Sequence, residues 1–123
     1  MTEEPRDLAL QALYQADRTG DTGPLAELPL RARQLVEGVM AESTQLDAAI
    51  TGASDHWSIE RMPVIDRAIL RLGLYELRHH RSTPAAVVVN EAVRLAKTYS
   101  TQRSGSFVNG VLAALAERER GEA

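Results

Sequence analysis

The sequence predicts an all-α fold, in which a helical bundle or a pair of bundles is built around a central helix, and three observations lead to this prediction. The stretch at about residues 62–79 is apolar on two sides when read at 100° per residue. In the other long segments, apolar residues recur at three-and-four spacing. Polar stretches containing Gly, Pro or Ser separate these segments at about 20–29, 52–61, 79–84 and 100–106. A chain of 123 residues is expected to form one domain.

The central helix is expected to begin near Pro63, which presets φ for a first helical turn, and Asp66 adds a negative charge near the positive end of the helix dipole. Apolar side chains cover two arcs of this helix, separated by a narrow gap that arginines fill. One arc holds Val64, Ile65, Ala68, Ile69, Leu72 and Tyr75, and the other holds Leu70, Leu74 and Leu77. Other helices must therefore pack against both sides. We expect Ile69, Leu72, Tyr75, Val88, Val108 and Leu112 in the core.

The N-terminal half is expected to hold two helices. The run Leu8–Ala16 consists of strong helix formers and predicts the first, and the loop at 20–29 leaves room for at most one turn at Leu25–Leu28. One long amphipathic helix is expected from Leu30 to about Ala53. A short turn at 58–61 should follow, with Trp57 plugging the junction.

The C-terminal half is expected to hold two helices after the central one. Thr83 and Pro84 form an N-cap followed by a proline at the first helical position. The run Val87–Val89 suggests a strand, but the apolar residues beyond it continue at helical spacing, so we predict a helix. A polar break at 100–106 precedes the last helix, whose buried stripe runs from Phe107 to Leu115.

Composition excludes several classes of protein. There is no cysteine, so disulfides, a thiol nucleophile and thiolate metal ligands are absent, and a cytoplasmic location is expected. The chain begins without a secretory pattern and holds no run of 18 apolar residues, so neither export nor membrane insertion is expected. Residues 1–60 carry four Arg and eleven Asp and Glu, a charge of −7, whereas 61–123 carry ten basic and six acidic residues, a charge of +4.

The residues favour a binding module over an enzyme. No nucleophile triad, phosphate-binding glycine loop or paired helical carboxylates are evident, so no catalytic residue and no cofactor are expected. The three histidines, His56, His79 and His80, lack the spacing of metal ligands, and we expect no metal site.

Aromatic and basic residues gather around the break at 100–106. Tyr99 and Phe107 flank this break, which contains Arg103 and Ser104, and rings beside basic and hydroxyl groups suit unstacked RNA bases and their phosphates. The alternative is that both rings belong to the core. Asp66 and Tyr14 also have two interpretations, a local structural role or a place on a contact surface.

Three ordered motifs resemble the NusB family of transcription antitermination factors. They are the run from Asp66 to Leu77 (DRAILRLGLYEL), the run from Val89 to Lys97 (VNEAVRLAK), and Ser104 with FVNGVL from Phe107. The segment from Ala9 to Gln15 resembles the first helix of that family, and 35–39 resembles its long third helix, so the resemblance covers nearly the whole chain.

The resemblance implies an all-helical fold of two three-helix bundles and a non-enzymatic function. NusB proteins bind the boxA segment of ribosomal RNA leader transcripts together with the ribosomal protein NusE, within the transcribing RNA polymerase complex. By resemblance, Tyr14 and Asp66 lie in the NusE contact, and Tyr99 and Phe107 lie beside the RNA. With Arg103 and Ser104, these are the expected contact residues.

The sequence departs from the family pattern in the residues that would bind phosphate. Where the family has a cluster of arginines at the first helix, this chain offers only Arg6, which we include among the expected RNA-binding residues. Arg103 stands where many members have an acidic residue. Two other functions stay open: a protein-only scaffold or homodimer with little RNA affinity, and an accessory RNA-binding domain for a ribosomal RNA methyltransferase.

Overall fold

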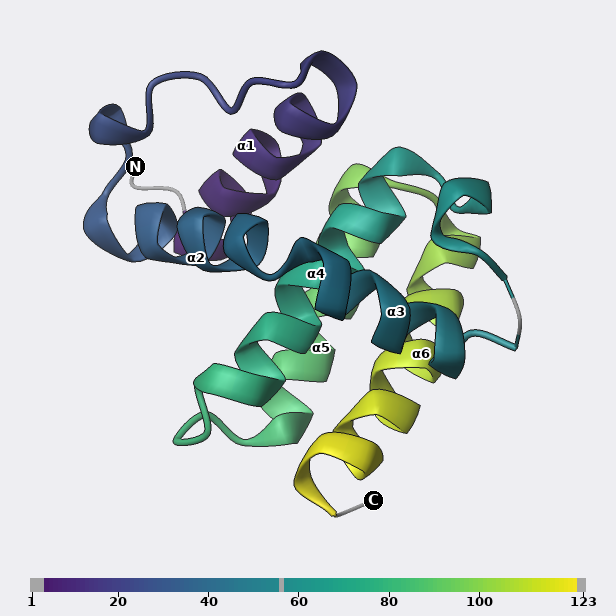
Figure 1. Ribbon diagram of the computed structural model, residues 1–123. Helices are drawn as coiled ribbons and strands as arrows, with labels where there is room; N and C mark the ends of the chain where they lie inside the picture. The colour runs from purple at the N-terminus through teal and green to yellow at the C-terminus, as the bar shows by residue number, and fades with distance from the viewer. Residues whose placement is uncertain (1–3, 56, 122–123) are drawn as a thin grey trace.

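The computed structural model describes residues 4–55 and 57–121, and this part of the chain contains helices and no strand (Figure 1). The α-helices are α1 (Pro5–Thr19), α2 (Leu30–Ala41), α3 (Ser43–Ala53), α4 (Val64–His79), α5 (Ala85–Tyr99) and α6 (Gln102–Arg120). Two single-turn 3₁₀ helices, η1 (Leu25–Glu27) and η2 (Ile59–Arg61), lie in the connections. The all-α prediction is confirmed, and Val87–Val89 is helical. None of the described helices has the length and apolar character needed to cross a membrane.

Helix α4 is the centre of the molecule, because each of the other α-helices packs against it. Figure 1 shows α1 and α2 together at one end of the structure and α5 and α6 at the other. Helix α2 packs on α1, α5 packs on α6, and α3 contacts both α4 and α6. The predicted core residues Ile69, Leu72, Val88, Val108 and Leu112 are all buried, and Tyr75 is half-buried against them. Helix α4 therefore has packing neighbours on both sides, as its two apolar arcs predict.

A glycine on α4 allows α6 to approach closely. Gly73 is buried, and a Cβ atom built on it would lie 2.8 Å from Cδ1 and 3.1 Å from Cδ2 of Leu112. Leu112 is itself fully buried, so it has little room to move away. The absent side chain of Gly73 is thus part of the α4–α6 packing.

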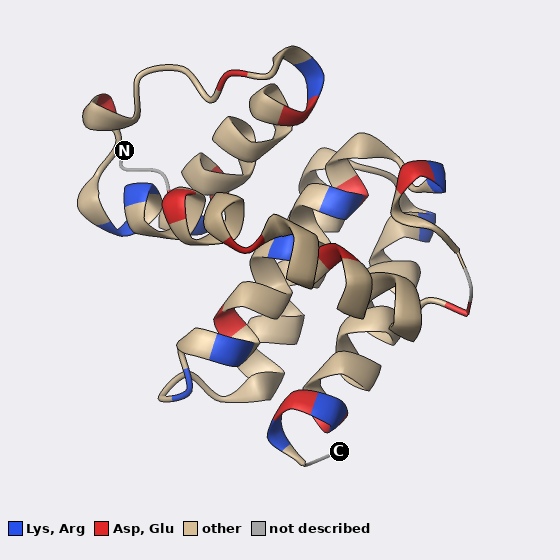
Figure 2. Cartoon of the chain, viewed as in Figure 1, with Lys and Arg blue, Asp and Glu red and all other residues tan. Residues whose placement is uncertain are grey.

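Ion pairs join α1 and α3 to one side of α4. Arg71 donates from Nε to Asp47 on α3 at 2.6 Å and lies 3.3 Å from the Asp17 carboxylate on α1. The Nε of Arg67 lies 3.4 Å from the same Asp17. The view of Figure 2 also shows basic and acidic positions next to each other at the end of α6, where Glu119 lies 2.9 Å from the Arg78 guanidinium of α4. Many basic side chains therefore hold the fold together and are not free for a ligand.

The structure divides the single long helix expected from Leu30 to Ala53. Glu42 has φ −113° and ψ 15°, which ends α2 and begins α3. Its backbone N–H is shared between the carbonyls of Gly38 and Val39 at 3.2 Å each. Since α2 packs on α1 and α3 packs on α6, the bend lets each half bury its own apolar stripe. The sequence shows only a polar interruption at this point.

Three other local expectations are corrected. Trp57 does not plug the junction before α4, because it is 53% exposed and the buried side chains of Ile59 and Met62 occupy the junction. The break expected at 100–106 is only two residues long, since Thr101 caps α6 by accepting the Ser104 N–H at 3.2 Å. The prolines expected at the first positions of α4 and α5, at 63 and 84, each stand one residue earlier, as extended N-cap residues.

Candidate nucleic-acid and partner interface

Two neighbouring grooves collect six of the seven residues that the sequence singled out, and Pro63 lines both. The first, which we call the tyrosine groove, has a volume of about 470 Å³, and the second, the aromatic–arginine groove, has about 420 Å³. The tyrosine groove is lined by Leu10, Gln11, Tyr14, Pro63, Val64, Ile65 and Tyr99. The aromatic–arginine groove is lined by Trp57, Arg61, Met62, Pro63, Asp66, Thr101, Arg103, Ser104 and Phe107.

The tyrosine groove brings together Tyr14 from α1 and Tyr99 from the end of α5. Tyr14 is half-buried, so part of its side chain is open to a partner, and the guanidinium carbon of Arg18 lies 5.5 Å from its ring centre. Tyr99 is 38% exposed, so its ring is reachable from solvent and the interpretation of Tyr99 as a purely core residue is wrong. Val64 and Ile65 line the same groove, so the two rings belong to a largely apolar surface with polar tips, which suits a protein partner.

A buried carboxylate that the sequence reasoning missed holds Tyr99 in place. The Tyr99 hydroxyl donates to Asp7 Oδ2 at 2.8 Å, and Arg94 donates to the same carboxylate at 2.7 and 3.2 Å. These bonds from Arg94 and Tyr99 lower the pKa of the Asp7 carboxyl below its ordinary value, and Asp7 in turn raises the pKa of Arg94. Asp7 lies on α1 and Arg94 on α5, so nothing local in the sequence marks the pair.

The aromatic–arginine groove has the composition of a nucleic-acid surface. Arg103 is exposed and Phe107 is half-buried, and both lie on the first two turns of α6. Phe107 is therefore helical as expected, whereas Arg103 does not lie in the expected loop. Trp57 and Arg61, which the sequence reasoning did not place in a site, line the groove from the segment around η2. The sequence does carry a signal for these two residues, because an aromatic and a basic residue stand four positions apart shortly before Pro63.

Asp66 and Ser104 have structural partners inside the chain. A residue of the expected NusE contact should be at least partly exposed before the partner binds, but Asp66 is only 2% exposed, so this expectation is wrong. Its two oxygens accept hydrogen bonds from the hydroxyls of Ser100 and Ser104, each at 2.7 Å. Ser104 is 5% exposed, so its hydroxyl is not free for RNA. The Ser104 hydroxyl, on the N-terminal turn of α6, is directed toward Asp66 on α4. Asp66 and Ser104 therefore form the buried floor of the groove and not its contact surface.

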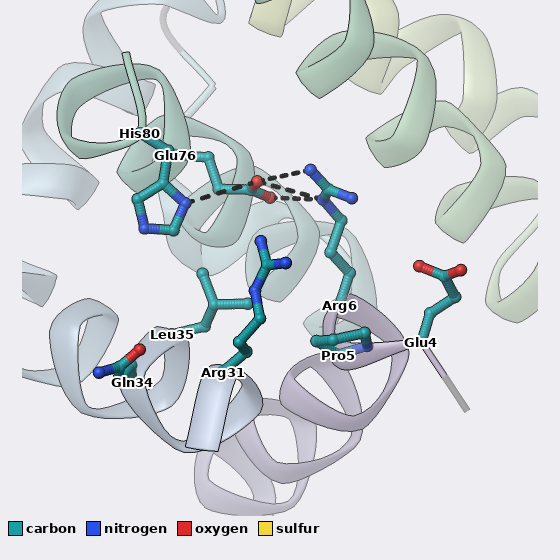
Figure 3. Close-up of a pocket in the computed structure, with 8 residues that line it drawn as sticks. All are labelled: Glu4, Pro5, Arg6, Arg31, Gln34, Leu35, Glu76 and His80. Atoms are coloured by element: carbon teal, nitrogen blue, oxygen red, sulfur yellow. Dashed lines mark hydrogen bonds and ion pairs between the residues drawn. The ribbon is translucent and has the colours of Figure 1, made fainter. Parts of the chain in front are cut away.

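Arg6 lies in neither groove. Its guanidinium makes a two-pronged hydrogen bond to the buried Glu76 carboxylate, at 2.8 to 3.1 Å, which raises the pKa of Arg6 (Figure 3). Figure 3 also shows Arg31 and His80 pointing into the same small pocket. The expectation that Arg6 is available to phosphate is therefore corrected: in this conformation its charge joins α1 to α4.

The described histidines do not form a metal site. His79 lies 2.8 Å from the Glu42 carboxylate, and His80 packs edge-on against the Tyr75 ring. Within residues 4–55 and 57–121, no three metal-ligating side chains gather. His56, the third histidine considered, lies outside the described residues.

Residues 3–117 match the model of the NusB family. The chain belongs to this family. It is 42% identical over 120 residues to the transcription antitermination protein NusB of Geobacter sulfurreducens, with 87% of each chain covered. It is 45% identical over 116 residues to NusB of Rubrobacter xylanophilus, covering 87% of this chain and 84% of the relative.

Solved structures agree with the family assignment. A NusB from T. maritima superposes with a TM-score of 0.83 at 29% identity, covering 97% of this chain and 94% of the other. A crystal structure of antitermination factors NusB and NusE with double-stranded RNA contains a chain that superposes with a TM-score of 0.81 at 28% identity, covering 93% and 94%. The resemblance on which the expectations of fold and function rest is thus confirmed at the level of the family.

Proposed function

We propose that this chain is a transcription antitermination factor that binds boxA-type RNA together with a NusE protein and acts within the transcribing RNA polymerase complex. In this proposal it is a cytoplasmic adapter and not an enzyme, and residues 1–123 act as a single domain. Family membership supports the proposal, as does the similarity to a solved complex of NusB, NusE and double-stranded RNA.

One observation carries the proposal: the two grooves meet at Pro63. The tyrosine groove is mostly apolar with polar tips, which suits a protein, whereas the neighbouring groove offers two arginines and two aromatic rings, which suit RNA. A NusE partner in the first groove and RNA in the second would touch each other. Binding of either one would then favour binding of the other, since each adds contacts that the other lacks.

The test is a titration of boxA-type RNA with this chain, with and without NusE, at salt concentrations from about 50 to 200 mM. We expect weak binding by the chain alone, because Arg6 and Arg94 are paired internally and the groove itself offers two arginines, Arg61 and Arg103, to neutralise phosphates. NusE should tighten binding. Arg103→Gln should weaken RNA binding in the complex and reduce the salt slope by about one. Arg118→Gln, an exposed arginine at the other end of α6, is the matched control.

The partner side is tested separately by calorimetric titration with NusE. Tyr14→Asp places an unpaired carboxylate in the tyrosine groove and should greatly weaken NusE binding. Leu30→Ala, a change at an exposed apolar residue of α2, should leave it unchanged. Binding of NusE without any salt-dependent RNA affinity would instead support the protein-only scaffold.

A further inference from the structure

Trp57 is the single tryptophan of the chain, and more than half of its surface is exposed. Large aromatic side chains at the surface are typical of interfaces, because their burial by a partner is strongly favourable. Trp57 lies at the edge of a groove that Phe107 lines from another element, α6. The groove therefore has aromatic side chains contributed from two separate parts of the fold.

A tight turn holds Trp57 in this position. Its backbone N–H donates to the Ser54 carbonyl at 3.1 Å, and the buried Ser54 hydroxyl donates to the Trp57 carbonyl at 2.9 Å. Asp55, within this turn, has a left-handed backbone with φ 52°, a conformation that Asp tolerates better than most residues. These bonds hold the backbone of Trp57, so a ligand that stacks on the ring has only the side chain left to order.

Two arginines add positive charge to the same groove. Arg61 and Arg103 are both exposed, and among the described residues no carboxylate lies within ion-pair distance of either guanidinium. The one carboxylate that lines the groove, Asp66, is 2% exposed and accepts two serine hydroxyls. The outer part of the groove therefore presents aromatic faces and cations, while its acidic group lies beneath the surface.

We propose that the aromatic–arginine groove takes an unpaired nucleotide of the RNA, with its base stacked on Trp57 and Phe107 and its flanking phosphates on Arg61 and Arg103. The inference rests on the proposed function and adds to it two binding residues, Trp57 and Arg61, from the segment around η2. A volume of about 420 Å³ lies in the range of small-ligand pockets, which is room for a nucleotide. A base in a duplex is already stacked on both faces, so only an unpaired base can use the rings.

The fluorescence of Trp57 tests this directly, because this chain contains no other tryptophan, and the same titration with Trp57→Phe measures any signal that comes from NusE. The complex of the full chain with NusE is titrated with a single-stranded boxA-type RNA, with the same RNA annealed to its complement, and with polyglutamate as a polyanion without bases. RNA affinity is measured in parallel by anisotropy of a labelled RNA. We expect quenching of Trp57 by the single strand, and little by the duplex or by polyglutamate.

The variants separate stacking from charge. Trp57→Ala should weaken single-strand binding about 5- to 150-fold, the range for losing one aromatic–base stack, while Trp57→Phe should keep most of the affinity. Arg61→Gln should weaken binding and reduce its salt slope, and Arg118→Gln should do neither. Melting temperatures equal to that of the unchanged chain would show that the variants are folded, as expected for exposed residues.

The two proposals fail in different ways. Tight RNA binding with unchanged Trp57 fluorescence and a silent Trp57→Ala would overturn this inference and leave the proposed function standing. Equal binding of duplex, or equal quenching by polyglutamate, would overturn it as well, the latter in favour of an acidic protein partner. If the complex with NusE binds no RNA at all, the proposed function fails, and this inference fails with it.

Discussion

The hydroxyl of Ser104 donates a 2.7 Å hydrogen bond to the carboxylate of Asp66, and this bond joins the first turn of α6 to the first turn of α4. The Ser100 hydroxyl, at the end of α5, donates to the other carboxylate oxygen at the same distance. One buried carboxylate therefore sets the positions of three helix ends. Arg103 and Phe107 project from the α6 turn that it holds, so Asp66 supports the groove from below without contacting a ligand.

Asp66→Asn should destabilise the fold by about 1–3 kcal/mol, because the amide nitrogen leaves one buried hydroxyl without its acceptor. Ser104→Ala should cost a similar amount, and the two changes together should cost less than their sum, since they remove the same bond. Urea denaturation followed by circular dichroism measures these differences. Glu37→Gln, at an exposed position of α2, is the control and should change stability by less than about 0.5 kcal/mol. If Asp66→Asn were as mild as this control, the role given to Asp66 would be wrong.

The Asp7 carboxylate should make stability depend on acid pH. Arg94 and Tyr99 lower its pKa in the folded chain, whereas an unfolded Asp titrates near about 4. The unfolded chain thus binds a proton first as the pH falls, so the stabilisation by Asp7 is complete above about pH 4–5 and is lost as the pH falls through the lowered folded value. Melting temperatures between about pH 2 and 7 should fall less steeply toward acid for Asp7→Asn, which cannot titrate. Identical slopes in the two proteins would exclude Asp7 as a source of acid sensitivity.

Arg120 should stabilise the C-terminal end of α4. Its guanidinium donates to the carbonyls of Glu76, Leu77, His80 and Thr83 at 2.6 to 3.3 Å, at the end of α4 and in the connection to α5. Carbonyls at the end of a helix lack some of their intrahelical partners, so these bonds are expected to be stabilising. Arg120→Ala should cost about 1.5–3 kcal/mol, and Arg120→Lys should recover only part of this, because an ammonium lacks the planar fork. Arg118→Ala, two residues earlier and exposed, is the control in the same denaturation experiment and should have little effect. Equal effects of the two alanine changes would contradict the capping role.

Two glycines should respond to alanine with opposite signs. Gly73→Ala forces a methyl group to within 2.8 Å of the buried Leu112, and such overpacking costs about 1–3 kcal/mol. Gly110, on the exposed side of α6, has nothing within 4 Å of its would-be Cβ, so Gly110→Ala should stabilise by roughly 0.5–1 kcal/mol through helix propensity. Thermal melting of the two variants decides the point. A higher melting temperature for Gly73→Ala would show that α4 and α6 can move slightly apart without losing stability.

The sequence by itself determined where helices form and which faces they bury. Periodicity and breaking residues act within one or two turns, so the central helix, the single turn at Leu25–Glu27 and the helical state of Val87–Val89 follow from local rules. The family could also be identified from sequence, because its motifs are contiguous: DRAILRLGLYEL and FVNGVL each lie within one helix.

Only the tertiary structure decided which polar side chains remain free to bind a ligand. Ser104 lies 38 residues from Asp66, and Glu76 lies 70 residues from Arg6. Their pairing depends on how helices cross, and no periodicity encodes a crossing. The bend at Glu42 and the exposure of Trp57 have the same origin, since α3 packs on α6 and Ile59 and Met62 fill the junction that Trp57 was expected to occupy. A charge or ring is available to a ligand only when packing has left it without an internal partner, and packing is a property of the whole chain.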